Sequence, residues 1–188
     1  MNRIRENKWM IGCIAMAIVL LIVSANIFAL NKQLNELKKD YVGNLNHEWY
    51  ELYRMSETVE KHYITNDYQE PTRYRLFVNQ VAHNFTGRPD DLSINMRNLL
   101  TLAYDPLFLD LSLEEGPLNK EEASTLLKDM NDDIMLISRS IIDMPDDEKE
   151  NLLLDPTSSE FNKVSTEVKA AYHKYIKLVD DYFRNNKY

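Results

Sequence analysis

The feature that most constrains this chain is a charge-free stretch near its start, from Trp9 to Asn31. The apolar core of this stretch, 10–30, is 21 residues long. As an α-helix it would extend about 31 Å, close to the roughly 30 Å hydrocarbon thickness of a bilayer. The sequence therefore predicts a transmembrane helix over 10–30 that contacts the lipid bilayer, preceded by a short basic tail over 1–9. The expected anchor residues are Trp9, Leu20 and Leu30.

A cleaved signal peptide is the competing interpretation of the same stretch. The basic start fits it, and the small residues Ser24, Ala25 and Ala29 would suit a signal peptidase. Against it, the apolar core runs past these positions to Leu30. The helical spacing then continues without Gly or Pro through Leu34, Leu37 and Tyr41. We therefore favour an uncleaved anchor that continues directly into a soluble helix.

The charges on the two sides of the span predict its orientation. The N-terminal tail holds three basic residues and one acid, and the other flank holds three lysines with two acids among them. The positive-inside rule gives a near tie on these numbers. Because the short tail adds its own amino group, we expect the N-terminus in the cytoplasm and the C-terminal domain outside the cell membrane.

The composition of the remaining residues, 31–188, excludes several classes of function. The whole chain has a net charge of −8, and all but one of its 30 Asp and Glu residues lie in this part. Nucleic-acid binding needs an excess of Lys and Arg, so we expect no nucleic-acid partner. The only cysteine, Cys13, lies in the apolar stretch, which leaves no disulfide framework. Four glycines and six prolines favour long helices over strands.

Apolar residues recur at steps of three and four through most of residues 31–188, which predicts one all-α domain. One seam of such residues begins directly after the apolar stretch: Leu34, Leu37, Tyr41, Leu45, Trp49, Leu52, Ser56, Val59 and Tyr63. Amphipathic helices joined by short loops hide their apolar faces against one another, which favours an antiparallel four-helix-type bundle. The expected helices are 31–64, 72–86 with 90–104, 120–143 and 158–184.

Turn and capping residues define the boundaries of these helices. Segment 90–104 is either a new helix or a continuation after a kink, and Asp105-Pro106 is expected to end it. Segment 107–113 alternates apolar and polar residues, so we expect an extended or single-turn connector there. Capping boxes are predicted at Asn119 with Glu122 and at Thr157 with Glu160. A short helix is expected over 146–154.

Motifs for catalysis, metal binding and phosphate binding are missing from the sequence. None of the four histidines has a carboxylate three residues before it, as di-iron bundles require. Gly-rich phosphate loops, a Gly-x-Ser-x-Gly elbow and the EF-hand spacing are also absent. Pairs of acids such as Asp132-Asp133 are better explained as helix caps and solvated faces. We therefore expect no enzyme, no catalytic residue, no metal site and no cofactor.

Aromatic residues are the more specific candidates for a binding site. They are concentrated in the helices expected over 31–64, 72–86 and 158–184. Core packing is the simpler explanation, with His47, His83 or His173 as hydrogen-bond partners of buried tyrosines. The functional alternative is a pocket or protein-binding surface formed by Trp49, Tyr53, His83 and Tyr172.

The sequence therefore predicts a non-enzymatic, single-pass membrane protein whose helical bundle is an interaction or scaffold module. A protein partner, or self-association through helical faces, is the expected mode of action. The alternative is an extracytoplasmic ligand-sensing domain that works with a separate signalling partner. In architecture alone, a membrane-attached helical bundle resembles the sensory domains of chemoreceptors.

Overall fold

The computed structural model of the chain describes residues 2–65, 70–113 and 117–186. All regular secondary structure in these residues is helical, with no strand among them, so the predicted all-α class is confirmed. The chain divides into two compact units, the N-terminal unit Met1–Gly43 and the C-terminal unit Asn44–Tyr188.

The N-terminal unit is helical throughout its described residues and belongs to helix α1 (Asn2–Thr58). Its apolar side chains are exposed, from Trp9 through Leu30 and on to Tyr41. The helix continues unbroken through Gly43, the last residue of this unit. Its backbone hydrogen bonds are satisfied internally, which is the condition that a segment placed in hydrocarbon has to meet.

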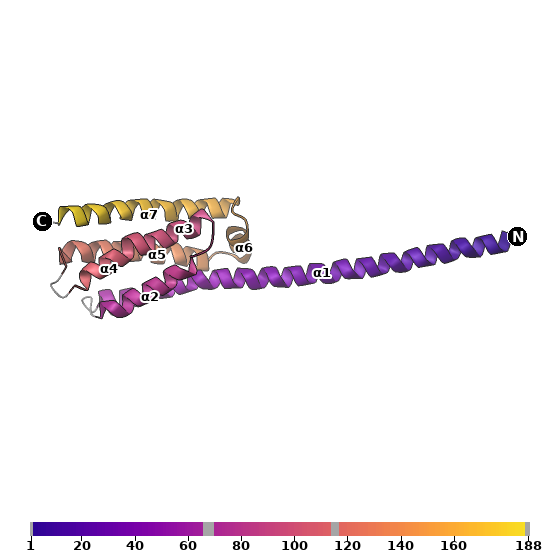
Figure 1. The fold of residues 1–188 in the computed structure, drawn as a ribbon, viewed down its shortest axis with the longest axis horizontal. Helices are drawn as coiled ribbons and strands as arrows, with labels where there is room; N and C mark the ends of the chain where they lie inside the picture. Colours follow the sequence, from indigo (N-terminus) through magenta and orange to yellow (C-terminus); the bar gives the residue numbers. More distant parts are fainter. Residues whose placement is uncertain (1, 66–69, 114–116, 187–188) are drawn as a thin grey trace. The chain divides into compact units, whose positions relative to one another are not determined.

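The C-terminal unit packs the end of α1 with the helices that follow it along the chain (Figure 1). Helix α7 lies against α3, η2, α5 and α6, whereas α2 lies against α4 and η2. The element bounds are η1 (Val59–Ile64), α2 (Pro71–Asn84), α3 (Asp91–Asn98), η2 (Leu99–Tyr104), α4 (Asp105–Leu111), α5 (Lys120–Ile142), α6 (Asp146–Leu154) and α7 (Ser159–Asn185).

The core of the C-terminal unit is aromatic and aliphatic. The ring of Trp49 meets that of Phe85 edge-on, with centroids 5.1 Å apart. The ring of Tyr63 stacks on that of Phe108 at 4.6 Å. Such ring pairs add to the free energy gained by burying their area. The largest fully buried side chains are those of Trp49, Tyr63, Tyr104, Tyr175, Tyr182, Phe85 and Phe108.

Segment 90–104 is a new helix, and the expectation that it ends at Asp105-Pro106 is wrong. Helices α3, η2 and α4 form one uninterrupted run from Asp91 to Leu111. Segment 107–113, expected as an extended or single-turn connector, is therefore mostly the end of this longer helical run. The reason is the π-helical turn η2, in which the backbone N–H of Asp105 bonds to the carbonyl of Leu100, five residues back. We infer that this wider turn relieves the clash that a proline ring makes in an α-helix.

Among the described residues, side-chain caps begin three of the helices. Asn119 accepts from the N–H of Glu122, as the sequence predicts, and Asp90 accepts from that of Ser93. The capping box at Thr157 is wrong. Ser158 caps α7 by accepting from the N–H of Phe161 at 3.0 Å.

The position of Thr157 explains this shift of the cap by one residue. Both its N–H and its hydroxyl donate to the carboxylate of Asp155, at 2.9 and 2.7 Å. The Thr157 side chain therefore closes the preceding turn and is not available to α7. Helix α6 has the bounds expected for the short helix over 146–154.

Candidate functional site

The apolar helix in the N-terminal unit is the feature with the clearest functional chemistry. Among the described residues, one helix is long and apolar enough to cross a membrane, and none of its most apolar window is buried. Trp9, Leu20 and Leu30, the expected anchor residues, are all exposed. Length and composition suit both a membrane anchor and a signal sequence.

The seam that the sequence predicts from Leu34 to Tyr63 is divided at the boundary between the units. Leu34, Leu37 and Tyr41 are exposed, and Leu37 retains 67% of its accessible surface. From Leu45 onward every member of the seam is buried in the C-terminal unit. One periodic pattern therefore covers two different environments, an open face before Gly43 and a packed core after it.

The four residues of the predicted aromatic site occupy different environments. Trp49 is fully buried, Tyr53 and Tyr172 are half-buried, and His83 is exposed. The hollows described below are lined by other residues. The ring of Tyr172 instead lies 5.2 Å from that of its neighbour His173. A shared pocket or interaction surface of these four residues stays a prediction.

A shallow hollow of about 360 Å³ lies between α5 and α7. Leu136, at its edge, is 69% exposed. Because Ala170 and Ala171 have short side chains, the two helices leave space between them. The hollow combines an apolar floor with charges of both signs, and its lining residues are Asp133, Leu136, Ile137, Glu167, Ala170, Ala171 and Lys174.

Asp133 ties the two helices together beside this hollow. Its Oδ2 atom accepts from the Tyr175 hydroxyl at 2.7 Å and from Lys174 Nζ at 3.0 Å. Burial, together with the hydrogen bond to this carboxylate, raises the pKa of Tyr175 well above its ordinary value. The phenol therefore stays protonated as a donor and acts as a structural link from α7 to α5.

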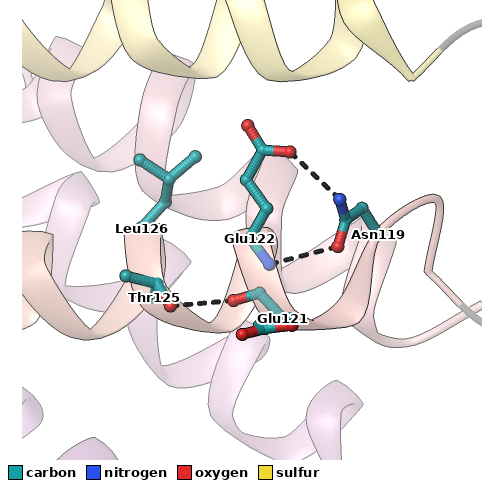
Figure 2. Close-up of a pocket in the computed structure, with 5 residues that line it drawn as sticks. All are labelled: Asn119, Glu121, Glu122, Thr125 and Leu126. Atoms are coloured by element: carbon teal, nitrogen blue, oxygen red, sulfur yellow. Dashed lines mark hydrogen bonds between the residues drawn. The ribbon is translucent and has the colours of Figure 1, made fainter.

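A second hollow, also of about 360 Å³, lies at the first turn of α5. Figure 2 shows hydrogen bonds among several of its polar groups. Asn119 Oδ1 accepts from the N–H of Glu122 at 3.3 Å, and Asn119 Nδ2 donates to Glu122 Oε2 at 3.2 Å (Figure 2). The hydroxyl of Thr125 donates to the carbonyl of Glu121. These contacts serve the helix terminus, and Leu126 completes the lining.

A buried carboxylate joins α4, α5 and α7 close to this turn. Asp110 is 3% exposed and accepts from the hydroxyl of Tyr182. That hydroxyl in turn accepts from the N–H of Asn119 at 3.1 Å. Burial and the Asp110 carboxylate both raise the pKa of Tyr182. The C-terminal ends of α4 and α7 are thus held together at the start of α5.

Carboxylates and an amide, rather than histidines, partner these buried tyrosines. Tyr175 and Tyr182 donate to aspartates, and Tyr104 donates to Asn131. His47, His83 and His173 are exposed. The expectation of Tyr–His pairs is therefore wrong for these three tyrosines, because the histidine positions fall on the solvent-facing sides of their helices.

Arg88 forms an ion-pair link between α1 and the start of α3. Its Nη1 atom lies 2.8 Å from Glu48 Oε2, and its Nε atom lies 3.3 Å from Asp90 Oδ2. Burial raises the pKa of Glu48, although the nearby guanidinium acts in the opposite direction. In the part of the chain that the structure describes, no group of three His, Cys, Asp or Glu side chains is placed to hold a metal ion.

Comparison of the chain with protein-family models, with curated proteins and with solved structures finds no match.

Proposed function

We propose that this chain is a single-pass membrane protein whose C-terminal unit acts as a non-enzymatic interaction or scaffold module. The observation that carries the proposal is the contrast between the units. The N-terminal unit exposes an apolar helix of one hydrocarbon thickness, whereas the C-terminal unit buries its own aromatic core. A helix of this composition is stable in lipid, and the packed unit needs no lipid to cover it.

The scaffold part of the proposal is supported by the way the buried polar groups are used. Asp110 and Asn131 are two of the buried polar residues of the C-terminal unit. Both bond across helices: Asp110 to Tyr182, and Asn131 to Tyr104 and to the carbonyl of Ser56. These contacts fix the relative positions of helices, which suits a rigid module that displays surfaces such as the one around Leu136.

We further propose that the expected four-helix-type core is formed by residues 44–64, 91–111, 120–142 and 159–185. The contacts of α7 with α3, η2 and α5, and those of α5 with α4 and η1, support this interpretation. Helix α2 then packs alongside as an additional helix against η2 and α4. The sequence left open whether a new helix begins near residue 90 or the helix over 72–86 continues after a kink. Because a new helix begins at Asp91, α2 becomes a separate helix in addition to the four of the core.

The decisive experiment is membrane fractionation of the full-length chain with a C-terminal tag. We expect a full-length species in the membrane pellet that resists extraction at high pH. Replacing Leu20 by Arg places a charge at the centre of the span, which costs about 2.5–3.5 kcal/mol of insertion free energy, so the pelleted fraction should fall. Leu136→Arg, the same change on an exposed residue of the C-terminal unit, is the matched control and should stay in the pellet.

Two other outcomes would contradict the proposal or its orientation. A shortened product free of the membrane would mean that residues 10–30 are a signal sequence. Protection of the C-terminal tag from protease in intact cells, followed by its loss on lysis, would place the C-terminal unit in the cytoplasm. Digestion of the tag without lysis would support the proposed external position.

A further inference from the structure

One face of the N-terminal unit has a strict heptad pattern that extends beyond the apolar stretch. Steps of three and four residues alternate without interruption from Cys13 to Tyr41. We call these nine residues the heptad stripe: Cys13, Met16, Leu20, Val23, Ile27, Leu30, Leu34, Leu37 and Tyr41. All nine are exposed in the structure, although such spacing places them on one helix face, as in the seam of a coiled coil.

Lipid covers only part of this stripe. Tyr41 lies 11 residues after Leu30, about 16 Å further along the helix axis. The headgroup layer beyond the hydrocarbon is roughly 5–8 Å thick on each side. Leu34 therefore falls within that layer, whereas Leu37 and Tyr41 lie beyond it, next to the charged residues Lys38 and Asp40. Exposed apolar residues at heptad spacing in water indicate a helical partner.

The same chain does not bury the stripe, because the spacing changes where the core begins. The steps from Leu37 to Tyr41, Leu45 and Trp49 are all of four residues, which rotates the apolar face out of the heptad register. Leu45 and Trp49 are buried in the C-terminal unit, and the stripe residues before them are not. The buried residues from Trp49 to Tyr63 resume steps of three and four, but they are one residue out of register with the exposed stripe.

The polar residues that flank the stripe match those of a second, identical helix. With Ile27 at position a and Leu30 at position d, Asn26 and Gln33 occupy g positions, and Asn31 and Lys38 occupy e positions. In a parallel pair each g residue meets the e residue five positions later on the other helix. The pairs are then Asn26 with Asn31 and Gln33 with Lys38. In each pair a side-chain donor lies opposite a side-chain acceptor, and no two like charges face each other.

We propose that the heptad stripe is the surface on which a second copy of this chain packs, parallel and in register, from the membrane to Tyr41. This inference rests on the proposed membrane anchoring, because copies inserted with one orientation can only meet in parallel. It also supplies a hydrogen-bond partner for the Asn26 amide, which lies within the apolar run where water is absent.

Disulfide cross-linking of the full-length chain in native membranes tests this surface. In a Cys13→Ser background, single cysteines replace Leu34 and Leu37 on the stripe, or Asn35 and Lys39 on other faces of the same helical turns. All four positions are exposed, so the variants do not disturb a core. We expect cross-linked dimer several-fold more abundant for L34C and L37C than for N35C and K39C on a non-reducing gel after mild oxidation.

The membrane fraction and size of each variant, scored on the same samples, separate the two proposals. A membrane-bound, full-length chain that cross-links equally at all four positions, or at none, would overturn the dimer surface and leave the anchor intact. A soluble, shortened chain would overturn both.

A second substitution tests the register of the pair. In the L37C variant, Asn26→Leu should lower the cross-linked fraction about threefold, the effect of losing one interhelical hydrogen bond in a membrane. Ala25→Leu is the matched control, because position 25 is an f position on the outer side of the same turn. A fraction that N26L leaves unchanged would contradict the in-register pairing.

Discussion

The hydroxyl of Tyr104 donates a 2.7 Å hydrogen bond to Oδ1 of Asn131, and both residues are fully buried. The Nδ2 atom of Asn131 donates in turn to the carbonyl of Ser56 at 3.1 Å. One amide thereby joins α1, η2 and α5. Because a buried amide without partners is costly, this contact fixes how the three helices align.

Replacing Asn131 by Leu should destabilise the C-terminal unit by about 2–4 kcal/mol, since it leaves the Tyr104 hydroxyl and the Ser56 carbonyl without this partner. Tyr104→Phe alone should cost less, about 1–2 kcal/mol. The double variant should be destabilised by less than the sum of the two single destabilisations, because the second change removes a donor that is already unpaired. The measurement is denaturant unfolding in a Trp9→Phe background, in which buried Trp49 is the only tryptophan. Full additivity would contradict the coupling.

Alkaline pH should unfold the C-terminal unit through its buried tyrosines. The pKa values of Tyr104, Tyr175 and Tyr182 are raised in the folded state, with burial as the first cause. Their stabilising contribution is complete below the unfolded value near 10 and is lost as the pH rises toward the folded values. Ionisation of each tyrosine in the unfolded state should lower the folding equilibrium constant by up to tenfold per pH unit above 10.

Unfolding midpoints measured between pH 8 and pH 11.5 check this dependence. Tyr104→Phe should reduce the alkaline slope, because one of the three titrating groups is removed. Leu127→Ala removes buried volume but no ionisable group, so it should lower stability while keeping the wild-type slope. Equal slopes for wild type and Y104F would show that Tyr104 is not involved.

Two glycines offer a matched pair of substitutions. A Cβ atom added at Gly43 or at Gly87 meets nothing within 4 Å, but Gly87 has φ +84°, whereas Gly43 lies within a helix. Gly43→Ala should stabilise the surrounding helix by roughly 1 kcal/mol, and Gly87→Ala should destabilise the turn after α2 by roughly 1–2 kcal/mol. Amide hydrogen exchange near each site measures both effects. The same sign at both positions would be inconsistent with the backbone argument.

The structure and the sequence pattern name different capping residues for α7, Ser158 and Thr157, and substitutions can tell them apart. Ser158→Ala should cost about 1 kcal/mol, because it removes the acceptor for the N–H of Phe161. The effect should appear as faster exchange of that amide. Thr157→Val leaves this acceptor in place and should not change the exchange of Phe161. A larger effect from T157V would restore the capping box that the sequence predicts.

Local patterns were sufficient where a neighbouring residue decides the structure. The helical spacing predicts the all-α class, and the caps at Asp90 and Asn119 are made by residues three positions away. The bounds of α6 follow from Pro145 and Asp155, which flank it. These interactions are complete within one turn of chain, so the sequence contains all that they require.

Other features depend on partners far away in the sequence. The hydrogen bond from Tyr182 to Asp110 joins residues 72 positions apart in the sequence, and the one from Tyr175 to Asp133 joins residues 42 positions apart. Periodicity identifies these tyrosines as inward-facing but does not reveal which acceptor lies opposite. The helix that continues past Pro106 also depends on a π-turn, for which single residues carry no clear signal.

The seam along α1 shows most clearly which features the sequence determines and which depend on the tertiary structure. Sequence alone determined that Leu34, Leu37, Tyr41, Leu45 and Trp49 share one apolar pattern, because helix periodicity is a local property. Only the tertiary structure decided that Leu45 and Trp49 are buried and that Leu34, Leu37 and Tyr41 are exposed. Burial depends on which other helices pack against a face, and that is settled by the fold as a whole.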